Sequence, residues 1–131
     1  MWLTLVEDTQ SIRAIYGDQT PELRKINLHE IKIVNGLEIN CNLRFDLNKL
    51  PENLPEKWVA KGVNTVQLDI SLVTSDIIFF KTSGGDIIGN IDIVSIENGK
   101  SVTFSSIEKE VFTIHTKWIY IRSITGYTKE P

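Results

Sequence analysis

Apolar and polar residues alternate with a period of two over much of this chain. The clearest run covers residues 37–48, where every second residue is apolar: Leu37, Ile39, Cys41, Leu43, Phe45 and Leu47. A second run repeats the pattern at Val66, Leu68, Ile70 and Leu72. Because successive side chains of a strand point to opposite faces of a sheet, each run predicts a strand with one buried and one wet face.

Turn residues separate these runs into hairpins. Asn35-Gly36 lies between the run 31–34 and the run 37–48, and Asn-Gly is a preferred pair for a tight type I′ turn. A hairpin is therefore expected over about residues 25–48. Its first strand changes phase near His29-Glu30, which predicts a β-bulge. Asn98-Gly99 predicts a second hairpin in the same way.

The remaining strands are predicted from shorter patterns. Residues 77–80 are apolar on both faces, so we expect them to lie deep in the core. Gly84-Gly85 marks a turn into a strand over 86–96. The last strand, or two strands with a bend, places these residues on one inward face: Phe112, Ile114, Thr116, Trp118 and Tyr120.

Helical signals are few. One short helix is expected near the start, capped by Asp8 or Thr9 and ending at Gly17. The Pro-containing stretch 50–62 predicts a loop with one helical turn at 56–60. Strands joined by short turns favour a mainly β fold (α+β minor): an antiparallel sheet or two-layer β-sandwich with one short N-terminal helix, in a single domain over residues 1–131.

Composition agrees with this fold and narrows the partners. The chain has 19 Ile, 9 Val and 11 Thr but two Ala, and β-branched residues suit strands. Its net charge is −3 and its cations are scattered, which argues against a nucleic-acid partner. No apolar run is long enough to span a membrane, and the start does not resemble a signal peptide. Together with the single Cys41, these features predict a cytoplasmic protein.

Candidate reactive groups are sparse. Cys41 falls on the apolar phase of its strand and is interpreted as a core residue. His29 and His115 lie far apart in the sequence, and neither has a second ligand at metal-binding spacing. His29 is the more interesting of the two, because a bulge can re-aim a side chain toward a site. The sequence therefore predicts no catalytic residue, no metal and no cofactor.

Several short motifs across the chain resemble the immunity protein 50 family of bacterial polymorphic toxin systems. These motifs are Ile15-Tyr16-Gly17-Asp18 followed by Pro21, Leu50-Pro51 with Pro55 and Lys57-Trp58, Asn64-Thr65-Val66-Gln67-Leu68, and Gly126-Tyr127. The resemblance implies a small cytoplasmic protein that binds and neutralises a cognate toxin domain without catalysis. The modest negative charge would complement a basic toxin, such as a nuclease.

A contact surface for such a partner is predicted from local features alone. Trp58 lies in an acidic, Pro-bounded loop with Glu52 and Glu56, and exposed aromatics often anchor interfaces. Turns around Asp76 and Asp86 are added to this surface, since loops on a rigid scaffold commonly carry recognition. The alternative for Trp58 is that its ring closes one end of the β core.

Two other functions stay open at this point. One is a generic ligand-binding or adaptor β module, which could use exposed aromatic rows or unpaired sheet edges. The other is a small hydrolase whose site is assembled from distant Asp, Glu and His residues. A deep polar pocket around His29 or His115 would favour the hydrolase.

Overall fold

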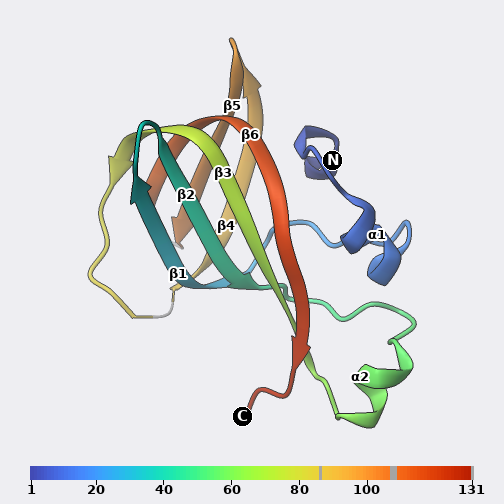
Figure 1. The fold of residues 1–131 in the computed structure, drawn as a ribbon. Helices are drawn as coiled ribbons and strands as arrows, with labels where there is room; N and C mark the ends of the chain where they lie inside the picture. Colours follow the sequence, from blue (N-terminus) through green and yellow to red (C-terminus); the bar gives the residue numbers. More distant parts are fainter. Residues whose placement is uncertain (86, 107–108, 131) are drawn as a thin grey trace.

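The computed structural model describes residues 1–85, 87–106 and 109–130 (Figure 1). Its helices are η1 (Trp2–Leu5), α1 (Gln10–Tyr16) and α2 (Glu56–Ala60). Its strands are β1 (Ile26–Asn35), β2 (Ile39–Asp46), β3 (Thr65–Phe80), β4 (Ile87–Ile96), β5 (Gly99–Ser106) and β6 (Glu110–Tyr127). Within the described residues, no helix has the length and apolar character needed to cross a membrane.

The strands form one antiparallel sheet that closes into a barrel in the order β1-β2-β3-β6-β5-β4. The two longest strands, β3 and β6, pair from Thr65↔Tyr127 to Phe80↔Phe112 and so connect the two halves of the barrel (Figure 1). The prediction of a mainly β, antiparallel fold is confirmed, and the antiparallel sheet rather than the two-layer sandwich describes it. Closure pairs strand edges that would otherwise be open to other chains.

The seam between β1 and β4 is the shortest pairing in the barrel. It consists of three residue pairs: Ile26↔Gly89, Asn27↔Ile88 and Leu28↔Ile87. Gly89 also pairs with Ser106 of β5, and a Cβ atom at this position would lie 2.2 Å from the Ser105 carbonyl oxygen. The seam therefore needs a residue without a side chain at this point.

Residues 1–25 contact both β4 and β6. The backbone N–H of Glu7 donates to the carbonyl of Ile119 on β6 at 2.8 Å, and the N–H of Ile91 on β4 donates to the carbonyl of Leu23 at 2.9 Å. The helix α1 lies in this segment, with Thr9 at its N-cap and Gly17 at its C-cap as predicted. The short N-terminal segment thus completes the core rather than standing apart from it.

The interior of the barrel follows the predicted period-two pattern closely. The inward residues of the two clearest runs are buried: Ile70 and its neighbours on β3, and Cys41, Leu43 and Phe45 on β2. Phe104 stacks on Phe112 with 5.7 Å between the ring centres. Burial raises the pKa of the Cys41 thiol, as expected for a small core residue, while a hydrogen bond with Ser75 acts in the opposite direction.

Both predicted hairpins form, but their turns differ from the prediction. Asn35 pairs with Ile39, so the first connection is the three-residue loop 36–38, and Leu37 is exposed at its tip instead of buried. In the second hairpin Gly99 pairs with Ile96, and the turn residues are Glu97 and Asn98. Core packing sets each strand register, and the turn adjusts to it.

Residues 77–80 are not deep in the core, contrary to the prediction. The β2–β3 pairing ends at Ser75, so beyond it β3 pairs with β6 alone among the described strands. Ile77 still packs against the core, but Ile78, Phe79 and Phe80 are exposed. An apolar run on both faces therefore marks the free end of a long strand here.

The predicted inward face of the last strand is correct only in its first half. Phe112, Ile114 and Thr116 are buried, but the next buried residue is Ile119. The phase changes where Thr74 of β3 adopts a φ of 60° and drops out of the pairing with β6. Trp118 and Tyr120 consequently point outward, and their prediction as core residues is wrong.

Candidate functional site

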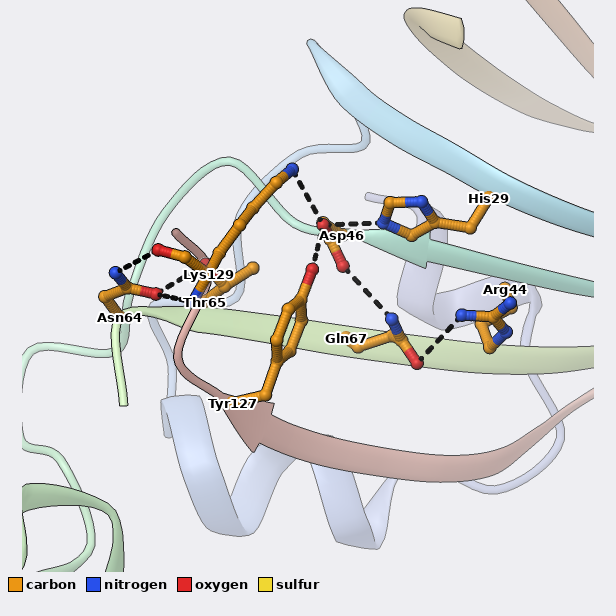
Figure 2. Close-up of polar contacts among 8 residues, drawn as sticks. All are labelled: His29, Arg44, Asp46, Asn64, Thr65, Gln67, Tyr127 and Lys129. Atoms are coloured by element: carbon orange, nitrogen blue, oxygen red, sulfur yellow. Dashed lines mark hydrogen bonds and ion pairs between the residues drawn. The ribbon is translucent and has the colours of Figure 1, made fainter. Parts of the chain in front are cut away.

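The most elaborate polar site surrounds Asp46, the last residue of β2. Its side chain lies on the outer phase of the strand, yet the residue is only 3% exposed. Four side chains contact its carboxylate (Figure 2). They are His29 Nε2 at 2.7 Å, Tyr127 Oη at 2.5 Å and Lys129 Nζ at 3.3 Å, all at Oδ2, and Gln67 Nε2 at 3.3 Å from Oδ1. These five residues are called the Asp46 cluster below.

Each member of the Asp46 cluster comes from a different segment. The predicted bulge in β1 is confirmed by the register shift between Leu28 and Glu30, and it turns His29 toward Asp46. Gln67 stands directly opposite Asp46 in the β2–β3 pairing. Tyr127 is the last residue of β6, and Lys129 lies in the C-terminal tail. The cluster therefore connects β1, β2, β3 and β6 to that tail.

The C-terminal tail is fixed beside this cluster by a backbone clamp. The backbone N–H of Lys129 donates to Asn64 Oδ1 at 2.7 Å, and Asn64 Nδ2 donates to the Lys129 carbonyl at 3.0 Å (Figure 2). Thr128 Oγ1 donates to the Gly62 carbonyl at 2.9 Å. Lys129 is thereby placed with its ammonium group over the buried carboxylate.

Asp46 is held as an anion. Burial alone would raise its pKa, but hydrogen bonds from Tyr127, His29 and Gln67 stabilise the charged form. The net result is that the pKa of Asp46 is lowered from its ordinary value. A buried carboxylate with this many donors is a structural junction, and removing it would take this acceptor away from all of them.

This stabilisation predicts a specific pH dependence. Because the pKa of Asp46 is lower in the folded protein than in the unfolded chain, its contribution to stability is fully present above the unfolded value of about 3.9. That contribution is lost as the pH falls through the lower, folded pKa. We expect the difference in unfolding free energy between the wild type and Asp46→Asn to shrink between pH 6 and pH 2. A difference that stays constant in urea titrations across this range would contradict the assignment.

The two histidines line separate shallow cavities. The cavity beside His29 has a volume of about 210 Å³ and is walled mainly by apolar side chains, including Leu28, Ile31, Phe80, Ile87 and Val111. The cavity beside His115 has a volume of about 240 Å³ and includes Asp76. Within 1–85, 87–106 and 109–130, no three His, Cys, Asp or Glu residues form a group that could hold a metal ion. The deep polar pocket expected of a hydrolase is not what surrounds His29.

The residues predicted as a contact surface do not gather in one place. Glu52 and Glu56 are exposed on the loop and on α2. Asp76 is also exposed, but it lies eleven positions beyond the start of β3 at Thr65, or roughly 35 Å along the strand. Asp86 lies outside the described residues. That surface stays a prediction.

Trp58 occupies the position given by its alternative interpretation. It is partly buried and packs against the core. A Cβ atom at Gly126 would lie 2.8 Å from the Trp58 ring and 2.8 Å from Val63. The ring therefore covers the end of the barrel where β6 finishes, and Gly126 leaves space for it.

Sequence reasoning did not identify Asp46, Gln67 or Lys129 as site residues. Asp46 sits on the polar phase of its strand, where a solvated carboxylate is the ordinary interpretation. In the sequence, His29 is distinguished by the predicted bulge, and Tyr127 belongs to the family-like motif Gly126-Tyr127. No local pattern shows that these residues meet, because the strand pairing that unites them is long-range.

Comparison with known proteins gives a family. No curated protein and no solved structure matches the chain. A family model does match, that of immunity protein 50, over residues 8–127 of the 131. The matched region begins two residues before α1, ends at the last residue of β6 and includes every member of the Asp46 cluster except Lys129. The chain therefore belongs to the immunity protein 50 family.

Proposed function

We propose that this protein binds a cognate toxin domain in the cytoplasm and neutralises it by occupying its surface, without chemical turnover. The observation that carries the proposal is membership of an immunity protein family over residues 8–127. An immunity protein needs a partner that is itself a protein. The proposal therefore concerns protein–protein recognition and not a small ligand.

The architecture supports a binding role. A closed barrel whose end is tied by the Asp46 cluster presents a preformed surface, and little conformational entropy is then lost on association. Asp46 and Lys129 form an ion pair with each other, in which the carboxylate is buried and the lysine side chain is partly exposed. The cavity beside His29 is small and mainly apolar, which suits packing better than acid–base chemistry.

Co-expression tests this function directly. A candidate toxin domain, sought among the genes that neighbour this one, is induced in a sensitive bacterial host, with or without this chain. We expect this chain to restore growth by several orders of magnitude in colony counts. As a specificity control, a toxin domain from an unrelated system should kill the host equally in both cases. Loss of viability despite soluble accumulation of this chain would contradict the proposal.

A further inference from the structure

The outer face of β6 carries an unusual set of exposed side chains. Trp118 is 42% exposed and Tyr120 is 41% exposed, while the side chain of Arg122 is 51% exposed. They occupy every second position of one strand and so project from the same face. Trp, Tyr and Arg are the residue types most enriched among the dominant contacts of protein interfaces.

The surface around these residues is polar and built from short side chains. Ser71 of β3 stands opposite Tyr120, and Asn42 of β2 stands opposite Ser71. The amide of Asn42 lies 3.0 Å from Ser71 Oγ. The Tyr120 ring therefore rises beside a low floor, where a partner can approach it. Trp118 stands opposite Val73 of β3, and Lys117 Nζ lies 5.8 Å from the centre of its ring. The core does not need Trp118 and Tyr120, because Ile119 and Ile121 supply the inward apolar side chains of this part of β6.

Two guanidinium groups on this face have donors to spare. Arg122 Nη1 is 3.4 Å from Asp69 Oδ2. Arg44 Nη1 is 3.4 Å from Gln67 Oε1, and its Nη2 is 3.8 Å from Glu30. All of these contacts are long for charge-assisted hydrogen bonds, which lie near 2.8 Å. A planar guanidinium with unused N–H groups is suited to bidentate binding of a carboxylate.

Asp69, between the two arginines, is incompletely satisfied. Its Oδ1 is buried and has no hydrogen-bond partner among the described residues. Burial raises the pKa of this carboxyl group, and Arg122 opposes that effect. The contact at Oδ2 is long, so Asp69 engages Arg122 only weakly and leaves its guanidinium able to bind a further carboxylate.

We propose that the face formed by Trp118, Tyr120 and Arg122 is where the toxin domain docks, through an apolar recess that receives the aromatic pair and carboxylates that pair with the arginines. We call it the β6 face. This inference rests on the proposed function. The net charge of −3 suggests a basic partner, whereas the arginines of this face favour an acidic one. Local charges decide between them, because they determine complementarity at a contact.

The dimensions of the β6 face suit such a contact. Three neighbouring strands, β2, β3 and β6, spaced about 4.8 Å apart, carry this face, so its width from the axis of β2 to the axis of β6 is roughly 10 Å. From Trp118 to Tyr127 the strand extends roughly 30 Å. This wall of the closed barrel is convex, so it fits a concave recess on the partner.

Affinity measurements with matched variants test the aromatic pair. The probe is an inactivated variant of the same candidate toxin domain, and its binding to the full-length chain is measured by calorimetry. We expect Trp118→Ala and Tyr120→Ala each to weaken binding by about 30-fold or more. Phe79→Ala is the control, because Phe79 is also an aromatic on a strand and is 40% exposed, but lies eight positions from Ser71 along β3. It should change the affinity by less than about threefold.

A charge pair of variants tests the arginine contacts. Arg122→Gln should slow association and weaken its dependence on salt, whereas Lys109→Gln, the same change of charge near the opposite end of β6, should leave both unchanged. Thermal unfolding of each variant confirms that it remains folded at the assay temperature. Arg122→Gln binding as fast as the wild type at every salt concentration would contradict the electrostatic part.

The outcomes separate the two proposals. If the wild type does not bind the inactivated domain, the proposed function is overturned, and this inference falls with it. If the wild type binds and both aromatic variants bind equally well, the β6 face alone is overturned. Loss of affinity in Glu52→Ala with Glu56→Ala, but not in Trp118→Ala, would likewise overturn it and assign the contact to the loop before α2.

Discussion

Replacing Asp46 with alanine is expected to lower the free energy of unfolding by about 3 kcal/mol, which for a chain of this length is a fall in Tm of roughly 10 °C. The carboxylate is buried and receives His29, Tyr127, Lys129 and Gln67. Removing it takes this shared acceptor away from all four side chains. Urea unfolding followed by tryptophan fluorescence measures the change.

Asp92→Ala is the matched control for this prediction. Asp92 forms an ion pair with Arg24 at 2.7 Å, which is shorter than the 3.3 Å between Asp46 and Lys129. Both side chains of the Asp92–Arg24 pair are, however, about half exposed. Exposed pairs contribute only about 0–1 kcal/mol. We therefore expect Asp92→Ala to cost less than 1 kcal/mol. Equal losses at the two aspartates would show that the Asp46 cluster is not a structural junction.

Gly89→Ala is expected to destabilise the fold by roughly 3 kcal/mol, although it adds a single methyl group. The added Cβ would lie 2.2 Å from the carbonyl oxygen of Ser105 and 3.0 Å from the ring of Phe104. The obstructing atom nearest to it is backbone, so relief requires β4 and β5 to separate. Because Gly89 also pairs with Ile26, that movement would strain the seam between β1 and β4.

Gly36→Ala tests whether the effect is specific to the seam. Gly36 lies in the loop 36–38, and the nearest atom to an added Cβ is the Glu38 carbonyl oxygen at 3.7 Å, an ordinary contact. This variant should stay within about 0.5 kcal/mol of the wild type. Urea unfolding and amide exchange of β4 would reveal a difference between the two variants. A Gly89→Ala protein as stable as Gly36→Ala would contradict the close strand approach.

Much of the fold could be predicted from local patterns. The period-two runs placed Cys41 and Ile70 in the core, and Gly17 ended the first helix as expected. The phase change at His29 identified a real bulge. These features depend on a few neighbouring residues, and local sequence is sufficient to specify them.

The errors share a physical cause. Whether Phe79 or Trp118 is buried depends on which strand lies beside it and where that pairing stops, and periodicity contains no information on either point. Asp46 looked like a solvated residue because the side chains that cover it come from positions 17 to 83 residues away. The chain closes into a barrel through three pairs between β1 and β4, which no local motif indicates.

The Asp46 cluster and the β6 face are connected through the barrel. Arg44 hydrogen bonds to Gln67, a member of the cluster, and also flanks Asp69 on the face. Tyr127 belongs to the same strand as Trp118 and Tyr120. A fixed cluster therefore helps to hold the strands of the β6 face in one arrangement, which reduces the cost of binding a partner.

Titration of toxin activity most directly tests the claim that this protein acts by binding. A fixed concentration of active toxin domain, well above the dissociation constant, is mixed with increasing amounts of this chain. If this protein acts by binding, toxin activity falls linearly and reaches zero near one molar equivalent. Complete inactivation by a small fraction of an equivalent, progressing with time, would show that this protein acts catalytically on the toxin instead.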